Sequence, residues 1–436
     1  MRVVIIGNSA TAVGAVESMR QHDQCSEIVI VTAEGSEVYS RPLLSHYVSG
    51  QIDASRLAYR DADFYTRHGV KAVLDTEVVA IEPHEHRIRA ASGETFSYDK
   101  LIICTGGVPI VPPVPGIDVG PEGGVFTFTR LADAVGILDY LDEHDVQHAV
   151  VVGGGMIGIK ATDALVHRAS SRENSMLFVT MVELAPRILS AGFDETASAL
   201  ITDVFAEGGV EVLTENTVTQ AHTSDGRLTS VSLRDGRELV CELLIFGIGV
   251  RPNAGLAADA GLAVNRGIVV DEFMRTSDPD IYAAGDVAEA YDLVVDMNRT
   301  VAIWPNAYRQ GAIAGAHIVG VPRADAGGVA MNTVEALGIP AMAIGSANVS
   351  EDEGYEVLSD LDQHARTYRR LVIQDDRLVG AILVNNINRA GIYTGLIRNK
   401  IPIGDARKAL MDEMLTLLSL PDNYRKHVVT GVGIEV

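Results

Sequence analysis

Cysteine is scarce in this sequence, and long hydrophobic runs are missing. The three cysteines among 436 residues are Cys25, Cys104 and Cys241, and no two of them have Cys-x-x-Cys spacing. This pattern argues against a disulfide framework and against a zinc site. No uncharged apolar run reaches the ~18 residues that a membrane-spanning helix needs, and no apolar signal segment precedes the first predicted strand. We therefore expect a cytoplasmic protein with no membrane partner and no bound metal.

Positive charge is also in short supply. The chain has 58 Asp and Glu residues against 35 Lys and Arg residues, a formal net charge of −23. A general nucleic-acid binder needs a basic face, so we do not expect a nucleic-acid partner. Apolar residues make up 47% of the chain, which is enough for packed cores, and the length fits two to four domains of the usual ~100–200 residues.

The most informative feature that is present is a pair of Gly-rich turns, each after an apolar strand and before a predicted helix. The first contains Gly7, Ser9 and Ala12, and Glu34 follows the next apolar strand. Such a turn offers backbone N–H groups to a dinucleotide pyrophosphate, and the acid accepts hydrogen bonds from a ribose. Alanine is an accepted third residue, whereas Ser9 adds a side chain beside the phosphate path. Taken alone, this turn favours a nucleotide site no more than a structural turn.

The second turn meets every condition of the G-x-G-x-x-G pattern. Gly153, Gly155 and Gly158 follow the strand at 150–152, and Glu183 ends the next strand. A carboxylate at that position would repel a 2′-phosphate, so NAD is favoured over NADP. The alternative is a tight helix–strand turn without a ligand. Two dinucleotides in one chain indicate electron transfer between them.

Four further motifs occur in a fixed order with these turns. They are Tyr39 to Ser45 (YSRPLLS), Thr105-Gly106, Gly247 to Asn253 (GIGVRPN) and Ala283 to Val287 (AAGDV). The set resembles the pyridine nucleotide–disulfide oxidoreductase superfamily, over nearly the whole chain. Within it, the chain is similar to the branch of NADH:rubredoxin and ferredoxin reductases and the flavin domain of NADH-dependent nitrite reductase. The resemblance implies an α/β fold with two Rossmann-like dinucleotide-binding domains and a C-terminal α+β domain.

The predicted domain boundaries combine this resemblance with composition, since four prolines between residues 108 and 116 read as a connection. The FAD-binding domain is discontinuous and takes 1–110 and 245–327, the NAD-binding domain takes 111–244, and the C-terminal domain takes 328–436. Two Asp-Gly turns between residues 210 and 240 predict an antiparallel meander. In the C-terminal domain we expect a β-hairpin over 369–384 and helices over 390–398 and 406–420.

The resemblance implies FAD in the first domain and NAD(H) in the second. At FAD it places Gly7, Ser9, Ala12, Glu34, Arg41, Pro42, Thr105, Gly106, Gly285, Asp286 and Trp304. By position, the first three would line the pyrophosphate, Glu34 would hold the adenosine ribose and Asp286 the ribityl chain. At NAD it places Gly153, Gly155, Gly158, Glu183 and Gly247, the last near the nicotinamide. For Trp304 the alternative is an ordinary core aromatic.

The positions of the cysteines differ from those in much of the superfamily. Its disulfide reductases, NADH oxidases and peroxidases use one or two thiols as an electron relay, whereas residues 39–45 contain no cysteine. We expect Cys25 and Cys241 to be small buried hydrophobic residues. Cys104 directly precedes Thr105-Gly106 and could approach the flavin, but alanine is common at that position in relatives.

Two charged residues also depart from the branch. His46 stands where ferredoxin reductases usually have lysine, and Lys160 stands where relatives commonly have glutamate. The hypothesis is that Lys160, with His46, sets the charge around the reduced flavin and so acts in catalysis. The alternative is that Lys160 points to solvent.

The predicted function is an FAD-dependent oxidoreductase that passes electrons between NAD(H) and a one-electron iron–sulfur carrier of the rubredoxin or ferredoxin type. The chain could also serve as the NADH module of a complex with iron–sulfur subunits, and a homo-oligomer is open. Two alternatives are an NADH oxidase or peroxidase and a non-catalytic flavoprotein scaffold. Small ferredoxins are often acidic, so docking would need a local basic patch, for which the C-terminal third offers eight residues. They are Arg366, Arg369, Arg370, Arg389, Arg398, Lys400, Arg407 and Lys408.

Overall fold

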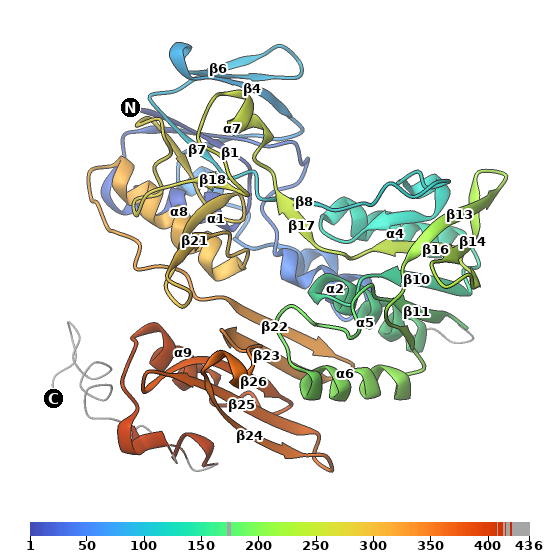
Figure 1. Ribbon diagram of the computed structural model, residues 1–436. Coiled ribbons are helices and arrows are strands. Elements are labelled where there is room, and N and C mark those ends of the chain that lie inside the picture. Colours follow the sequence, from blue (N-terminus) through green and yellow to red (C-terminus); the bar gives the residue numbers. More distant parts are fainter. Residues whose placement is uncertain (172–175, 408, 413–414, 416–418, 421–436) are drawn as a thin grey trace. The chain divides into compact units, whose positions relative to one another are not determined.

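The computed structural model describes residues 1–436 apart from 172–175, 408, 413–414, 416–418 and 421–436 (Figure 1). The chain forms two compact units. Unit 1 contains Met1–Ile110, Thr129–Leu131 and Val250–Ala330, and unit 2 contains Val111–Phe128, Ala132–Gly249 and Met331–Val436. No described helix is long and apolar enough to cross a membrane.

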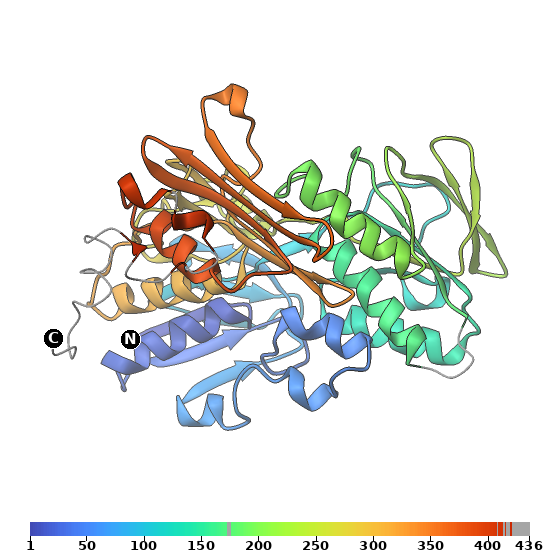
Figure 2. The same ribbon diagram turned by 90° about the horizontal axis from the view of Figure 1, so that it is seen from below.

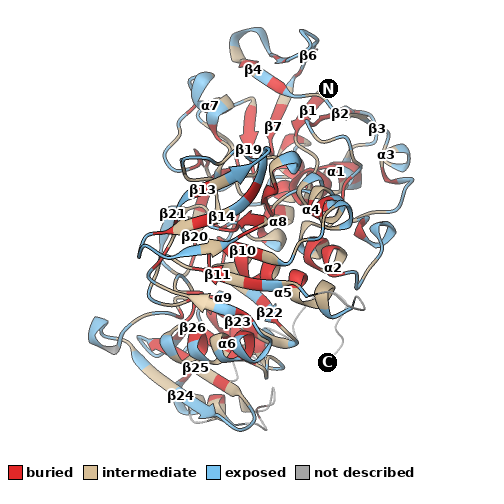
Figure 3. Cartoon of the chain, turned by 90° about the vertical axis from the view of Figure 1, so that its right-hand side faces the viewer, coloured by how far each residue is buried: buried red, intermediate tan, exposed pale blue. Residues whose placement is uncertain are grey.

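Unit 1 is built on a five-stranded parallel sheet with the order β19-β7-β1-β2-β3. These strands are β1 (Arg2–Ile6), β2 (Glu27–Val31), β3 (Val70–Val73), β7 (Lys100–Ile103) and β19 (Ile281–Ala283). Runs of Val and Ile make the central strands almost fully buried, as expected for a parallel sheet covered on both faces (Figure 3). The strand predicted at 3–6 and the helix after it are confirmed.

Helices α1 (Ala10–His22) and α8 (Trp304–Ile318) lie side by side in unit 1 (Figure 2). A Cβ on Gly14 would collide with the carbonyl oxygen of Tyr308, and one on Gly311 would collide with that of Thr11. Glycine at these positions therefore lets the two helix backbones approach each other directly. The remaining elements of unit 1 are α2 (Leu44–Val48), α3 (Phe64–Arg67), α7 (Gly255–Asp259), β4 (Val78–Glu82), β5 (Arg87–Ala90), β6 (Thr95–Ser97), β8 (Gly107–Pro109), β17 (Val250–Pro252), β18 (Ile268–Val269), β20 (Ala288–Asp292) and β21 (Met297–Arg299).

Unit 2 repeats this architecture with the strand order β12-β11-β10-β16-β9, again parallel. The strands are β9 (Val125–Thr127), β10 (His148–Val152), β11 (Phe178–Val182), β12 (Glu211–Leu213) and β16 (Leu243–Phe246). The helices are α4 (Leu131–Glu143), α5 (Met156–Ser170) and α6 (Glu195–Glu207). The predicted meander is present as β13 (Val218–Ser224), β14 (Arg227–Leu233) and β15 (Glu238–Val240). Unit 1 has a matching meander, β4-β5-β6, which the sequence analysis did not predict.

The C-terminal part of unit 2 is an antiparallel sheet of order β22-β23-β26-β25-β24. Its elements are β22 (Met331–Ala336), β23 (Ile339–Gly345), β24 (Glu356–Asp362), β25 (Thr367–Gln374), β26 (Arg377–Val384) and α9 (Ala390–Arg398). The hairpin over 369–384 and the helix over 390–398 are confirmed. Because β22 packs on α5 and α6, the C-terminal sheet and the second parallel sheet form one compact unit (Figure 1).

The helix predicted over 406–420 is not what the described residues show. They form short 3-10 turns at Gly404–Arg407 and Ala409–Met411, and Met414, Leu417 and Leu418 lie outside the described residues. The hydroxyl of Tyr393 on α9 donates to the carbonyl of Leu410 at 2.8 Å, which ties this segment to α9. Of the apolar positions on which that helix was predicted, only Leu410 is described, and it is buried.

Candidate functional site

The first Gly-rich turn connects β1 to α1 at the carboxyl end of the unit 1 sheet. Gly7 has a φ of +107°, and a Cβ there would collide with the carbonyl oxygen of Cys104. Only glycine fits this turn. Ser9 is the N-cap residue of α1, yet its side chain makes no capping hydrogen bond, so its hydroxyl is not used by the helix. Ala12 is fully buried.

Glu34 follows β2 and is held by two side chains. Arg41 Nη2 lies 2.5 Å from its Oε1, and the Tyr39 hydroxyl donates to its Oε2 at 2.6 Å. Burial opposes ionisation of Glu34, but the Arg41 guanidinium and the Tyr39 hydroxyl outweigh it and hold the pKa of the carboxyl below its usual value. Arg41 also donates to the carbonyl of Thr129 at 2.9 Å. The acid at the ribose position is therefore ionised and largely neutralised by Arg41.

Asp286 follows β19 and the turn at Gly285, whose N–H donates to Gln310 Oε1 at 2.9 Å. Burial raises the pKa of Asp286, and the positive charge of Arg41 opposes that rise. No hydrogen bond joins its carboxylate to another described residue, so it has unused acceptor capacity. The sequence analysis placed Arg41 beside the flavin, and the structure gives it both Glu34 and Asp286 as charged neighbours. Pro42 is exposed in the 3-10 turn Arg41–Leu43.

Thr105 and Gly106 lie where the chain leaves the parallel sheet of unit 1. The Thr105 hydroxyl donates to the carbonyl of Asn253 at 2.8 Å, and the Asn253 N–H donates to the carbonyl of Gly106 at 2.9 Å. Trp304 begins α8 and packs edge-on against Tyr59 with ring centroids 5.0 Å apart. Trp304 is only half-buried, which does not fit the alternative of a core aromatic.

The second Gly-rich turn connects β10 to α5 and is held by three interlocking glycines. Gly153 has a φ of +113°, and a Cβ there would lie 2.6 Å from the carbonyl oxygen of Gly247. A Cβ on Gly158 would collide with the carbonyl oxygen of Gly153, and one on Gly247 would lie 2.7 Å from the Gly158 Cα. Gly155, by contrast, has open space where its Cβ would be. The space beside Gly155 at the N-terminus of α5 is therefore open, and backbone N–H groups at a helix N-terminus favour a phosphate.

Glu183 follows β11 and is held by backbone groups. Its Oε2 accepts a hydrogen bond from the Gly154 N–H at 2.5 Å, and its Oε1 accepts one from the Ala185 N–H at 2.7 Å. These bonds orient the carboxylate beside the turn but add no positive charge. The negative charge predicted to repel a 2′-phosphate is therefore not paired with a described cation.

Lys160 and His46 belong to different units, and each has its own neighbours. His46 Nδ1 lies 2.5 Å from Gln51 Oε1. Lys160 is half-buried on the second turn of α5, where burial lowers its pKa and the charges of Asp163 and Glu335 partly offset that. Its surroundings are thus not those of a lysine that points freely to solvent. Its role at the flavin stays a prediction.

The cysteines supply no exposed thiol beside the first turn. Cys104 and Cys241 are buried, and burial raises the pKa of both thiols well above the usual range. Cys25 is exposed, so its expected burial was wrong, because it lies in the turn after α1 where its N–H donates to Asp23. Among the described residues, no cluster of three His, Cys, Asp or Glu side chains could hold a metal.

Several residues that shape the site escaped the sequence analysis. Gly14 and Gly315 bring α1 and α8 together, and Tyr39 orients Glu34. The spacing of Gly311 and Gly315, four residues apart on one helix face, was a readable signal of close helix packing. Nothing in the sequence indicated the partners of Tyr39.

The residues present fit the two dinucleotides. The unused Ser9 hydroxyl and the unpartnered Asp286 carboxylate are groups that a phosphate and a hydroxyl would satisfy. No described atom outside its chain neighbours and its own helix backbone lies within 4 Å of where a Gly155 Cβ would be, which leaves room for a phosphate. Each feature stands at the carboxyl end of a parallel sheet, where such folds bind nucleotides.

Comparison with known proteins supplies the family. The family model for pyridine nucleotide-disulphide oxidoreductases matches residues 1–311. The chain belongs to this family. A second model, the C-terminal domain of rubredoxin NAD+ reductase, matches residues 331–401. The resemblance and the fold class stated above are thereby confirmed, and this flavoprotein family of oxidoreductases uses FAD and NAD(H).

Two relatives and one solved structure show which members of the family the chain is similar to. It is 31% identical over 418 residues to the assimilatory nitrate reductase electron transfer subunit of Bacillus subtilis strain 168, covering 94% of this chain but 51% of that protein. It is 29% identical to the NADH-dependent phenylglyoxylate dehydrogenase subunit epsilon of Aromatoleum evansii, covering 95% and 96%. Putidaredoxin reductase in its covalent complex with putidaredoxin has a TM-score of 0.85 at 26% identity, with 98% of both chains covered. The chain thus spans about half the length of the first relative.

Proposed function

We propose that this oxidoreductase takes electrons from NADH at FAD and delivers them to an iron–sulfur partner without a protein disulfide. The observation that carries the proposal is the pairing of two dinucleotide-type turns with the burial of Cys104, the cysteine next to the first turn. A thiol relay needs a thiolate that can be reached. Without one, electrons must leave for an external acceptor.

The chain's own residues bind and orient in this proposal, while FAD, when bound, supplies the hydride and electron chemistry. The Ser9 hydroxyl and the α1 N-terminus hold its pyrophosphate, and Asp286 accepts a hydrogen bond from a sugar-chain hydroxyl. Glu183 holds the adenosine ribose of NADH. We keep the domain boundaries predicted above as part of this proposal. In it, the C-terminal domain, 328–436, provides the surface on which the iron–sulfur partner docks.

The names of the relatives support an iron–sulfur acceptor. One neighbour is a reductase joined to putidaredoxin, and two relatives are named as subunits of larger enzymes. We therefore propose that the partner is either a free carrier or an iron–sulfur subunit of a complex.

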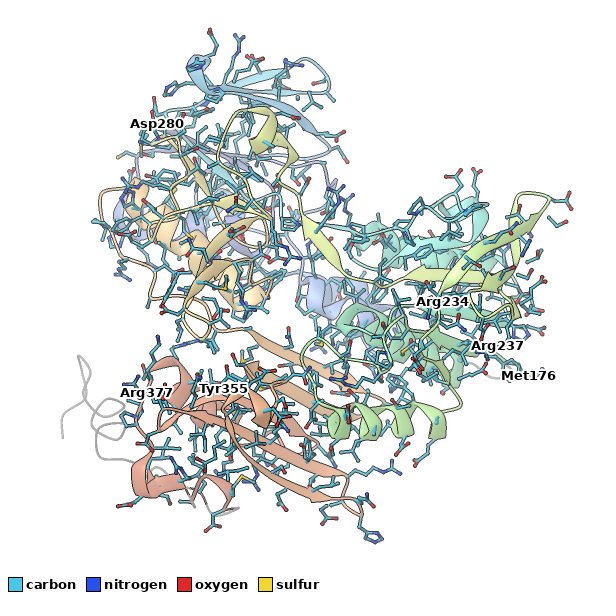
Figure 4. The ribbon with its side chains drawn as sticks, in the orientation of Figure 1. Met176, Arg234, Arg237, Asp280, Tyr355 and Arg377 are labelled. Atoms are coloured by element: carbon cyan, nitrogen blue, oxygen red, sulfur yellow. The ribbon has the colours of Figure 1, made fainter. Side chains whose placement is uncertain are left out.

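The predicted basic patch is reduced by pairing within unit 2. Arg366 pairs with Glu207, and Arg370 lies 3.4 Å from Asp194. Arg407 pairs with Asp376. Of the predicted patch, Arg398 and Lys400 are exposed, and Lys408 lies outside the described residues. Arg377 at the β25–β26 turn, which was not part of the prediction, is a further exposed cation of this domain (Figure 4). Docking of an acidic carrier would therefore depend on a small group of charges, and its rate should fall as salt screens them.

The test is an anaerobic stopped-flow experiment with the FAD-loaded chain. NADH should bleach the flavin absorbance, and oxidised ferredoxin or rubredoxin should restore it faster than air does. Restoration by air alone would favour the oxidase alternative, and a protein that binds no FAD would favour the scaffold.

A variant of Cys104 tests whether electron transfer to the carrier uses a thiol. Cys104→Ala should keep the rate of carrier reduction, because the buried thiol takes no part in it. A large loss of that rate, with FAD retained, would contradict transfer without a thiol.

A further inference from the structure

The loop after Glu183, residues 184–193, folds back onto the second Gly-rich turn. The Leu189 N–H donates to the carbonyl of Gly154 at 2.7 Å, and the Ile188 side chain lies 2.7 Å from where a Gly154 Cβ would be. The Ser198 hydroxyl on α6 donates to the carbonyl of Ile188 at 2.8 Å. The loop is therefore fixed beside the carboxylate of Glu183.

Arg187 is the one cation in this loop. An arginine near the ribose is the usual partner of the 2′-phosphate of NADPH. In this structure its Nη2 instead lies 3.2 Å from the carbonyl oxygen of Phe193 and 3.4 Å from Asn348 Oδ1. Its Nε is buried and has no partner among the described residues. The guanidinium is therefore held by the loop's own backbone and by Asn348, and it is incompletely satisfied.

Asn348 comes from the C-terminal part of unit 2, just after β23. Its Nδ2 donates to the carbonyl of Ser190 at 2.8 Å while its Oδ1 faces Arg187. One exposed side-chain amide thus bridges the loop backbone and the loop's cation. The neighbouring Gly192 also packs toward this sheet, since a Cβ there would lie 3.6 Å from Asn332 and 3.8 Å from Ala343.

We propose that Asn348 is a specificity-determining residue, which acts by holding Arg187 away from the position of a 2′-phosphate. Discrimination against NADPH then has two parts: the unpaired negative charge of Glu183 and the withholding of Arg187. The second part is supplied by the C-terminal part of unit 2, through Asn348. This inference rests on the proposed binding of NADH at the second turn.

The test measures binding of ADP-ribose and 2′-phospho-ADP-ribose by calorimetry, which needs neither flavin turnover nor an acceptor. Glu183→Ser removes the repulsion and is the starting variant. Adding Asn348→Ala should tighten 2′-phospho-ADP-ribose binding about tenfold, because the freed guanidinium can form charge-assisted hydrogen bonds to the phosphate. Adding Arg187→Ala to that pair should abolish the gain. Asn348 is exposed, so its truncation removes no core packing.

Asn388→Ala is the matched control, an exposed asparagine of the same domain that does not contact the loop. It should leave the affinity of the Glu183→Ser variant for 2′-phospho-ADP-ribose unchanged. Equal affinities with and without Asn348, or a gain that survives Arg187→Ala, would overturn the inference. If the unaltered chain bound no ADP-ribose, the NADH site itself would be wrong, whereas normal ADP-ribose binding without carrier reduction would reject only the proposed electron acceptor.

Discussion

Each Gly-rich turn follows the central strand of a five-stranded parallel sheet, but the two turns achieve close packing in different ways. In the second turn, Gly153, Gly158 and Gly247 meet one another, so the motif's own glycines allow the close approach of helix and strands. In the first turn Ala12 replaces the last glycine, and the close approach occurs instead between α1 and α8 at Gly14 and Gly311. The glycines of the G-x-G-x-x-G pattern therefore have two roles: they allow a tight turn, and they allow the following helix to pack closely on its neighbours. Glycines elsewhere in the chain can fulfil the second role.

The acids after the two turns differ in the same way. Glu34 is held by the Arg41 guanidinium and the Tyr39 hydroxyl, and its charge is largely neutralised. Glu183 is held by two backbone N–H groups, and no described cation pairs with it. Glu34 can orient a ribose without repelling a neighbouring phosphate, because Arg41 neutralises its charge. Glu183 can orient a ribose and can also repel a 2′-phosphate.

The strongest test of the comparison is Gly158→Ala. The new methyl group has nowhere to go but into the Gly153 carbonyl, so we expect a loss of about 3 kcal/mol or more in the free energy of unfolding and no NADH binding. Gly155→Ala is the matched control, because its Cβ enters open space. That variant should lose less than about 1 kcal/mol in stability and still bind NADH more weakly. Chemical denaturation and NADH titration measure both, and equal stabilities would contradict the interlocking role of Gly158.

The corresponding test in unit 1 is Gly14→Ala. A Cβ there meets the Tyr308 carbonyl, so we expect a loss of about 1–3 kcal/mol in unfolding free energy from overpacking. Ala12→Gly, which restores the motif's third glycine, should cost about 1 kcal/mol through lower helix propensity and should not strengthen FAD binding. Denaturant unfolding and FAD titration check this pair. A more stable Ala12→Gly protein would show that the motif position still carries the packing.

A smaller change is expected for Asp286→Asn in the FAD-free protein. Burial raises the pKa of this carboxyl, so its ionised form reduces stability at pH values above that raised pKa, and the penalty disappears as the pH falls through it. At pH 7 the variant should therefore be more stable by about 1 kcal/mol, with the difference shrinking toward pH 4. FAD should bind it more weakly. A less stable variant at pH 7 would mean that Asp286 has a partner in the native protein.

The smallest expected effect belongs to Ser9→Ala. If the free hydroxyl of Ser9 bonds the pyrophosphate, FAD affinity should fall about three- to tenfold, with no change in unfolding of the FAD-free protein because no capping bond is lost. Ser9→Thr keeps a hydroxyl and should retain the affinity. Fluorescence titration of FAD measures the difference. Unchanged affinity in Ser9→Ala would leave the first turn with backbone contacts alone.

Much of the fold was predictable because its signals are local. Val and Ile runs identified the buried parallel strands, and the glycines of both turns were read correctly as strand-to-helix junctions. The helix expected over 406–420 is absent from the described part of that range, because apolar spacing identifies buried positions but does not distinguish an α-helix from short 3-10 turns. The exposure of Cys25 was missed for a similar reason, since residue type alone does not place a turn at the surface.

The order of motifs along the chain predicted two dinucleotide-type units and, by resemblance, their family, and both are confirmed. The assignment of FAD to the imperfect turn rests on the same resemblance and stays a prediction. The two strand-turn-helix junctions follow from backbone geometry, which a few glycines and β-branched runs impose locally. The pairing of Glu34 with Arg41, the lone charge of Glu183 and the restraint of Arg187 by Asn348 emerged only from the folded chain. Each depends on side chains whose distance in space is set by how strands, helices and the C-terminal sheet pack, and charge interactions depend on that distance rather than on sequence separation.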